Sequence, residues 1–136
     1  MYQKSIHLKP YTRGFHLITD QVEALLSSSG LQNGIVHLFI KHTSASLTIN
    51  ENIDPSVRSD MEEFFRDTCD DKGYFVHTYE GRDDMPAHLK ASLLGSSVTI
   101  PLTKGRLNLG IWQGIYLGEH RDRAGGREIV VTVIGS

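Results

Sequence analysis

KHTSASLTINENIDP, residues Lys41 to Pro55, is the stretch around which the chain is organised. Its residues alternate in character, with apolar side chains at Ala45, Leu47 and Ile49 and polar ones between them. Because successive side chains of a strand point to opposite faces, the pattern predicts a strand with one face in the core. The other face carries short hydrogen-bonding groups suited to a ligand or metal: His42, Ser44, Ser46, Thr48 and Asn50. The alternative is an edge strand whose polar face meets water.

The composition is that of an ordinary globular protein. The chain has 136 residues, of which 39% are hydrophobic and 22% charged, and these values predict one domain, 1–136. The formal net charge of −2 gives no support for nucleic-acid binding, which requires a basic surface. The longest apolar runs are too short to span a bilayer, and the N-terminus has no signal-peptide pattern. A single cysteine, Cys69, fits a reducing compartment, so we expect a cytoplasmic protein without membrane or nucleic-acid partners.

Three segments have the features of helices. Asp54-Pro55 combines a helix cap with proline at the first helical position, and the following apolar residues share one face of a helix of about fourteen residues. A second helix is predicted over 20–29, where an Asp-x-x-Glu pattern resembles a capping box and a glycine follows. A third is predicted within 80–95, where Asp84 can cap, Pro86 lies in the first turn and Gly95 is the stop.

Short runs of β-branched and aromatic residues predict further strands over 5–8, 15–18, 35–41, 74–79, 97–102, 115–120 and 127–134. The run 35–41 is almost continuously apolar, which predicts a strand buried on both faces. The last strands follow one another without room for helical crossovers, so antiparallel pairing is expected. The predicted fold class is α+β, a single domain with a mainly antiparallel curved β-sheet or sandwich packed with about three helices.

Three histidines stand at the starts or ends of predicted elements: His42, His88 and His120. Such positions can converge at one rim of a sheet, and three neutral imidazoles with an open position suit zinc or another divalent ion. Four carboxylates could orient these ligands or act as general bases: Glu51, Asp83, Asp84 and Glu119. No local spacing forces the histidines together, so a local cap with a surface histidine remains the alternative for Asp84 and His88.

The segments HTSASLTINEN, HTYEGRDDMPAHLK and GRLNLGIWQGIYLGEHR, in this order, resemble the YjbQ-like family of small bacterial and archaeal proteins. The resemblance covers nearly the whole chain. It implies a compact α+β fold, a homotrimer, and secondary thiamine-phosphate synthase activity on phosphorylated small molecules. It also implies a polar pocket at the matching positions, which are His42, Asn50, Glu51, Asp84, His88 and His120.

The implied reaction joins an aminopyrimidine-methyl diphosphate to a thiazole phosphate, whose nitrogen displaces diphosphate. Because that nitrogen is already nucleophilic, the site must chiefly align the two rings and neutralise the leaving diphosphate, a task for a divalent metal such as zinc or magnesium. The expected metal ligands are His42, His88 and His120, and the expected catalytic groups are Glu51, Asp84 and Glu119. The expected substrate-binding residues are Lys41, Ser44, Ser46, Thr48, Asn50 and Arg121.

Two other functions fit the same residues. A metal-dependent hydrolase would use Glu51 or Asp84 as the base for an attacking water. A non-enzymatic trimeric protein would hold a metabolite or a metal without turnover. Trp112 and the glycine-rich segment around it are candidates for a subunit interface.

Overall fold

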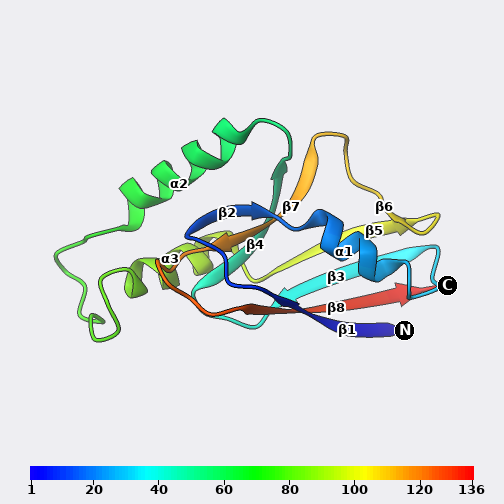
Figure 1. Ribbon diagram of the computed structural model, residues 1–136, viewed down its shortest axis with the longest axis horizontal. Helices are drawn as coiled ribbons and strands as arrows, with labels where there is room; N and C mark the ends of the chain where they lie inside the picture. Colours follow the sequence, from blue (N-terminus) through cyan, green and yellow to red (C-terminus); the bar gives the residue numbers. More distant parts are fainter.

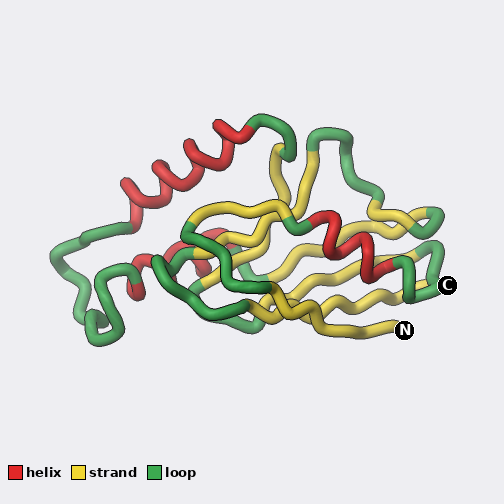
Figure 2. Tube along the Cα trace, viewed as in Figure 1, coloured by secondary structure: helices red, strands yellow, loops and turns green.

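The computed structural model describes all of residues 1–136 and contains eight strands and three helices (Figures 1 and 2). In chain order they are β1 (Tyr2–Leu8), β2 (Gly14–Leu17), α1 (Thr19–Leu26), β3 (Gly34–Ile40), β4 (Ala45–Glu51), α2 (Pro55–Cys69), α3 (Asp84–Leu94), β5 (Ser97–Thr103), β6 (Arg106–Leu107), β7 (Gln113–Glu119) and β8 (Arg127–Gly135). One sheet has the strand order β1-β8-β3-β5-β6 and the other β2-β7-β4. Every strand pair is antiparallel, so the predicted α+β class is confirmed.

One apolar core joins the two sheets. Val36 of β3 and Val131 of β8 belong to the same cluster of buried side chains as Leu117 of β7. Helix α1 adds Val22 and Leu26, which are both buried. The alternation of apolar and polar residues in the strands therefore places one face of each sheet against the other.

Helices α2 and α3 lie at the end of the molecule away from both chain termini (Figure 1). Helix α2 begins as predicted, because the Asp54 side chain accepts a hydrogen bond from the Ser56 N–H and Pro55 occupies the first turn. Helix α3 packs on β4, and α2 packs on β2. The two helices thus cover strands of the smaller sheet. None of the three helices has the length and apolar composition needed to cross a lipid bilayer.

Three predictions about local structure are wrong. Residues 74–79 form a loop with no strand partner, and Tyr74, Val76 and Tyr79 are 76%, 95% and 97% exposed. Their β-forming side chains lack a neighbouring strand edge, and propensity without a partner does not make a strand. Strand β3 is buried on one face only, because Ile35 and Phe39 are 52% and 43% exposed. Helix α1 ends at Leu26, and its N-cap residue makes no side-chain hydrogen bond, so the predicted capping box does not form.

Candidate functional site

His77, Asp84 and His88 form the one cluster of metal-ligating side chains in the structure. His77 lies in the loop between α2 and α3, while Asp84 and His88 occupy the same face of α3 one turn apart. The Asp84 Oδ2 atom lies 2.8 Å from His77 Nε2 and 3.2 Å from His88 Nε2. One ligand atom of each residue lies within 4.8 Å of the others. Two imidazoles and one carboxylate therefore converge on one point.

A layer of polar contacts fixes the Asp84 carboxylate. Its side chain is only 3% exposed, and Oδ1 accepts a 2.8 Å hydrogen bond from Arg121 Nη1. Arg121 also donates from Nε to Asp83 Oδ2 at 2.9 Å and from Nη2 to the Glu80 carbonyl at 2.9 Å. Burial raises the pKa of Asp84, but the hydrogen bond from His77 and the charges of His88 and Arg121 outweigh it and hold that pKa below its ordinary value. Asp84 is therefore an anion in a fixed orientation.

The orientation of His88 leaves a lone pair facing that anion. His88 Nδ1 lies 2.8 Å from the Thr43 carbonyl oxygen, and because a carbonyl only accepts, Nδ1 carries the proton. In a neutral ring Nε2 is then an acceptor, and it faces Asp84 Oδ2, another acceptor, at 3.2 Å. Either a second proton on the ring or a bound cation reconciles the two atoms. A histidine held through Nδ1–H by a backbone carbonyl is the usual arrangement of a metal ligand, so the residues present fit a divalent cation.

Space for a substrate lies on both sides of this cluster. One cavity of about 540 Å³ is lined by His42, Thr43, His88, Ser92 and Ser96 among others. A second cavity of about 380 Å³ lies at the loop that carries His77 and includes Lys72, Phe75 and Arg82 in its lining. The first has histidine and hydroxyl groups, and the second adds cationic groups. The cluster is thus reachable by a polar small molecule.

The structure brings only one of the three predicted histidine ligands into this cluster. His42 Nε2 accepts a 2.9 Å hydrogen bond from the Glu128 N–H, so its lone pair is already used. His120 is 1% exposed, and its Nε2 lies 2.8 Å from the Ser46 Oγ. Burial, assisted by the positive charges of Lys90 and Arg127, lowers the pKa of His120 to about 3. His120 is therefore a neutral core side chain, and only His88 of the predicted set lies in the cluster.

Two of the three predicted catalytic carboxylates have structural partners. Glu51 Oε2 accepts hydrogen bonds from the N–H groups of Ile53 and Asp54, both at 2.9 Å, and so shapes the turn before α2. Glu119 is fully buried and forms an ion pair with Arg127, with Nη2 to Oε2 at 2.6 Å and Nε to Oε1 at 2.8 Å. Only Asp84 stands at the cluster, where Asp83 orients Arg121 as the predicted supporting carboxylate.

The predicted substrate-binding residues do not form an open row. Ser44 and Ser46 are buried, and Ser44 accepts a hydrogen bond from Arg127 while Ser46 pairs with His120. Protein partners therefore occupy the part of this polar face at Ser44 and Ser46, and α3 packs against β4 nearby. The remaining predicted residues are dispersed. Thr48 is half-buried, and Asn50 Oδ1 accepts a hydrogen bond from the Glu51 N–H. Lys41 Nζ lies 3.5 Å from Glu128, and Arg121 donates its hydrogen bonds to acceptors of the protein itself.

His77 is the site residue that the sequence pattern missed. It lies within the segment 74–79, whose aromatic and β-branched residues predict a strand, and a strand assignment gives its imidazole no role. The available signal was its position seven residues before Asp84 and eleven before His88, in the segment HTYEGRDDMPAHLK. A loop that returns to the first turn of α3 brings all three side chains together.

Known proteins resemble this chain over its whole length. Residues 4–136 match the model of the family described as UPF0047 protein YjbQ-like. UPF0047 protein YjbQ of Escherichia coli O157:H7 is 53% identical over 135 residues, which are 98% of each chain, and a UPF0047 protein of Synechocystis sp. is 40% identical over 98% of this chain and 92% of its own.

Solved structures agree with the fold. A YbjQ-like protein of unknown function from Sulfolobus solfataricus superposes with a TM-score of 0.90 at 29% identity, covering 99% of this chain and 97% of its own. A protein of the YjbQ/UPF0047 family from Clostridium acetobutylicum superposes with a TM-score of 0.85 at 37% identity, covering 98% of this chain and 100% of its own. The three helices, the curled antiparallel sheets and the sequence matches together show that this chain belongs to the UPF0047, or YjbQ-like, family.

Proposed function

We propose that the protein is a metal-assisted enzyme acting on a phosphorylated small molecule, with His77, Asp84 and His88 as the metal-binding residues. The observation that carries the proposal is the lone pair of His88 Nε2, held toward the carboxylate of Asp84 by the bond of Nδ1 to Thr43. A divalent cation bound there would neutralise charge on a phosphate or diphosphate. The protein's own contribution is orientation, since Arg121 fixes Asp84 and Asp83 fixes Arg121.

Within this class we propose a transferase similar to the secondary thiamine-phosphate synthases. In that reaction the thiazole nitrogen forms a bond to the pyrimidine methylene carbon, the bond from that carbon to the diphosphate oxygen breaks, and the electron pair leaves with diphosphate. No oxidant and no strong base are required. This requirement matches the structure, because Glu51 and Glu119 are engaged in the fold and the cluster has no free carboxylate base. The cationic group of Lys72 lies in the adjoining cavity, where a phosphate could approach it, while Arg82 of the same lining is paired with Asp71.

Metal content gives the first test. Elemental analysis of freshly purified protein is expected to find about one divalent metal equivalent per chain, as a single site of this ligand count would hold. His77→Ala and His88→Ala should each lose it. His37→Ala should keep it, because that ring lies on β3 of the larger sheet, where it hydrogen-bonds to Thr99 and not to the cluster. Re-addition of zinc or magnesium after chelation should raise the melting temperature of the wild type and not of His88→Ala. Metal retained in both cluster variants would exclude this site.

Turnover decides between the functional classes. The wild type is assayed with both thiamine precursors together and with each alone. Release of diphosphate only when both are present supports the transferase, and release from one alone indicates a hydrolase. A loss of turnover in His88→Ala with an unchanged circular dichroism spectrum ties the activity to the cluster. A wild type that holds the metal but turns over no precursor would exclude the synthase proposal.

We also propose that the chain assembles as a homotrimer through the outer face of the larger sheet. On this face Ile35 lies opposite Ile134 and Phe39 opposite Val130, and the exposed fractions of Ile35, Phe39 and Ile134 are 52%, 43% and 61%. Contiguous exposed apolar side chains of this kind are typical of subunit contacts. Light scattering should give three times the chain mass of 15.2 kDa, and Ile35→Lys with Phe39→Lys should give the monomer. A monomeric wild type would contradict the proposal.

A further inference from the structure

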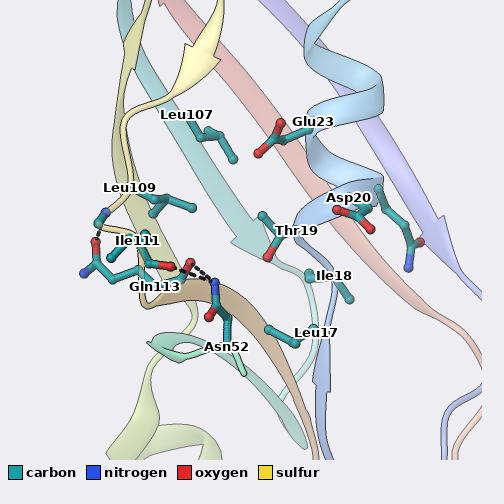
Figure 3. A pocket seen from close by; sticks show the side chains of 12 residues that line it. Leu17, Ile18, Thr19, Asp20, Glu23, Asn52, Leu107, Leu109, Ile111 and Gln113 are labelled. Carbon is teal, nitrogen blue, oxygen red and sulfur yellow. Dashed lines mark hydrogen bonds between the residues drawn. The ribbon is translucent and has the colours of Figure 1, made fainter. Parts of the chain in front are cut away.

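A cavity of about 580 Å³ lies between α1 and the segment that joins β6 to β7 (Figure 3). This volume is within the range of pockets that bind small molecules. None of its lining residues belongs to the cluster of His77, Asp84 and His88. The cavity is therefore a separate site, and what it binds has to be argued from its own side chains.

Five apolar side chains line part of the cavity. Leu17 and Ile18 line it where β2 passes into α1, and Leu107, Leu109 and Ile111 line it on the opposite side. Figure 3 shows Leu107 of β6, and Leu109 of the segment that follows it, extending toward α1. Leu109 is only partly buried against the core, and Ile111 is 81% exposed. An apolar or aromatic ligand body between these walls would remove their surface from water.

The charge in the cavity is negative. Asp20 and Glu23 of α1 line it, and no lysine or arginine does. Glu23 has one ion-pair partner, Arg106, whose Nη2 lies 3.5 Å away on a side chain that is 79% exposed, and Asp20 has none. Figure 3 shows the Glu23 carboxylate extending toward Leu107. Carboxylates at an apolar cleft favour a cation and disfavour a phosphate or carboxylate.

An unused acceptor lies at the same site. Asn52 donates from Nδ2 to the carbonyl oxygens of Ile111 and Gln113, at 3.3 and 3.1 Å, which fixes the orientation of its amide (Figure 3). Its Oδ1 is buried and accepts no hydrogen bond in the structure. A buried carbonyl oxygen normally has a donor partner. Asn52 therefore adds a preference for a ligand that donates from nitrogen or oxygen.

We propose that this cavity binds a small organic ammonium ion with an apolar or aromatic body. The ammonium group pairs with the carboxylates of Asp20 and Glu23, and the body lies between the leucine side chains of the opposite wall. The site is independent of the proposed transferase centre, because the two share no residue.

Benzylamine and benzyl alcohol are suitable probes, since they share the aromatic body and differ in charge at pH 7. Trp112, the only tryptophan, lies between Ile111 and Gln113 and reports binding by its fluorescence, and nitrogen-15 spectra of the full chain map the site. Benzylamine is expected to shift the amide signals of residues 19–23 and 109–113 in a saturable way. It should bind about tenfold more tightly than benzyl alcohol, and this difference should shrink at high salt.

Substitutions test each part of the argument. Asp20→Asn with Glu23→Gln should weaken benzylamine binding about tenfold and leave benzyl alcohol unaffected. Glu63→Gln, whose side chain is 78% exposed on α2, is the matched control and should change nothing. Leu109→Phe should narrow the cavity at the apolar wall and weaken both probes. His88→Ala should bind benzylamine like the wild type, which separates this proposal from the metal site. Equal affinity for the two probes, or full benzylamine affinity in the double carboxylate variant, would overturn the proposal.

Discussion

Replacement of Arg127 by methionine should severely destabilise the protein. Arg127 donates two hydrogen bonds to Glu119, at 2.8 and 2.6 Å, and two to Ser44, at 3.0 and 3.2 Å. The two charged side chains are 8% and 0% exposed. Without Arg127 the Glu119 carboxylate stays buried with only the Arg121 N–H, at 3.2 Å, as a donor. A buried charge deprived of its partner costs about 3–5 kcal/mol, a large share of the roughly 5–15 kcal/mol that stabilises a typical domain.

The measurement is equilibrium unfolding in urea at one fixed chain concentration, followed by Trp112 fluorescence. For a domain of 136 residues, a loss of this size corresponds to a fall of about 10–15 °C in melting temperature. The double variant Arg127→Met with Glu119→Leu removes both charges and should return to within about 1 kcal/mol of the wild type. Arg82→Met is the control, because its pair with Asp71 lies at the surface and its side chain is 84% exposed. Its urea midpoint should match the wild type.

Two results would refute this reasoning. A loss below about 1 kcal/mol for Arg127→Met would mean that water reaches Glu119 in the folded chain, so that burial does not isolate the charge. A double variant as unstable as the single one would mean that packing of the arginine side chain, and not its charge, stabilises the fold.

Three further predictions concern the core around the smaller sheet. The pKa of His120 is about 3 in the folded protein, so below about pH 6.5 the unfolded chain gains a proton that the folded chain does not. The free energy of unfolding should therefore fall by up to about 1.4 kcal/mol per pH unit between these two pH values. Urea unfolding across that range measures the slope, which His120→Gln should lose. Gly118→Ala should cost about 1–3 kcal/mol in the same assay, since a Cβ atom there would lie 2.3 Å from Ser46 Oγ and 2.8 Å from the His120 ring, whereas Gly125→Ala meets no atom within 4 Å and should be neutral. Phe15→Ala should lower the free energy of unfolding by about 3–5 kcal/mol because Phe15 is 5% exposed, whereas Phe64→Ala, at a residue that is 61% exposed, should lower it by less than about 1 kcal/mol. A larger loss for Phe64→Ala than for Phe15→Ala, measured by calorimetry, would contradict the packing described for α2.

The sequence predicts most of the fold because its signals are local. Asp54 sets the start of α2 by accepting a hydrogen bond from the N–H of Ser56, two residues further on, with Pro55 between them. Gly95 ends α3 with a φ of 104°, a backbone conformation that other residues rarely adopt. The strands follow from alternation within a few residues. The strand predicted over residues 74–79 does not form, because a strand also needs the edge of a neighbouring strand, and tertiary structure determines whether one is present.

The candidate site is harder to predict because its residues meet only through tertiary packing. Asp84 and His88 were found by their spacing on one helix face, but His77 joins them through a loop. The polar row of β4 was placed on one strand face, but only tertiary packing determines whether such a face meets a ligand or a buried protein partner. Ser46 Oγ and His120 Nε2 pair with each other inside the protein, and no local sequence pattern predicts that pairing.

The position of β8 in the larger sheet determines when that sheet can form during synthesis on the ribosome. Strand β8 lies between β1 and β3 and pairs with both, although residues 127–135 are made long after residues 2–8 and 34–40. Until β8 emerges, β1 has no partner strand and β3 has one unpaired edge, and such edges are prone to pair with other chains. Completion of the sheet is therefore a late step of synthesis, and a ribosome that stalls before residue 127 holds a chain that cannot close its core.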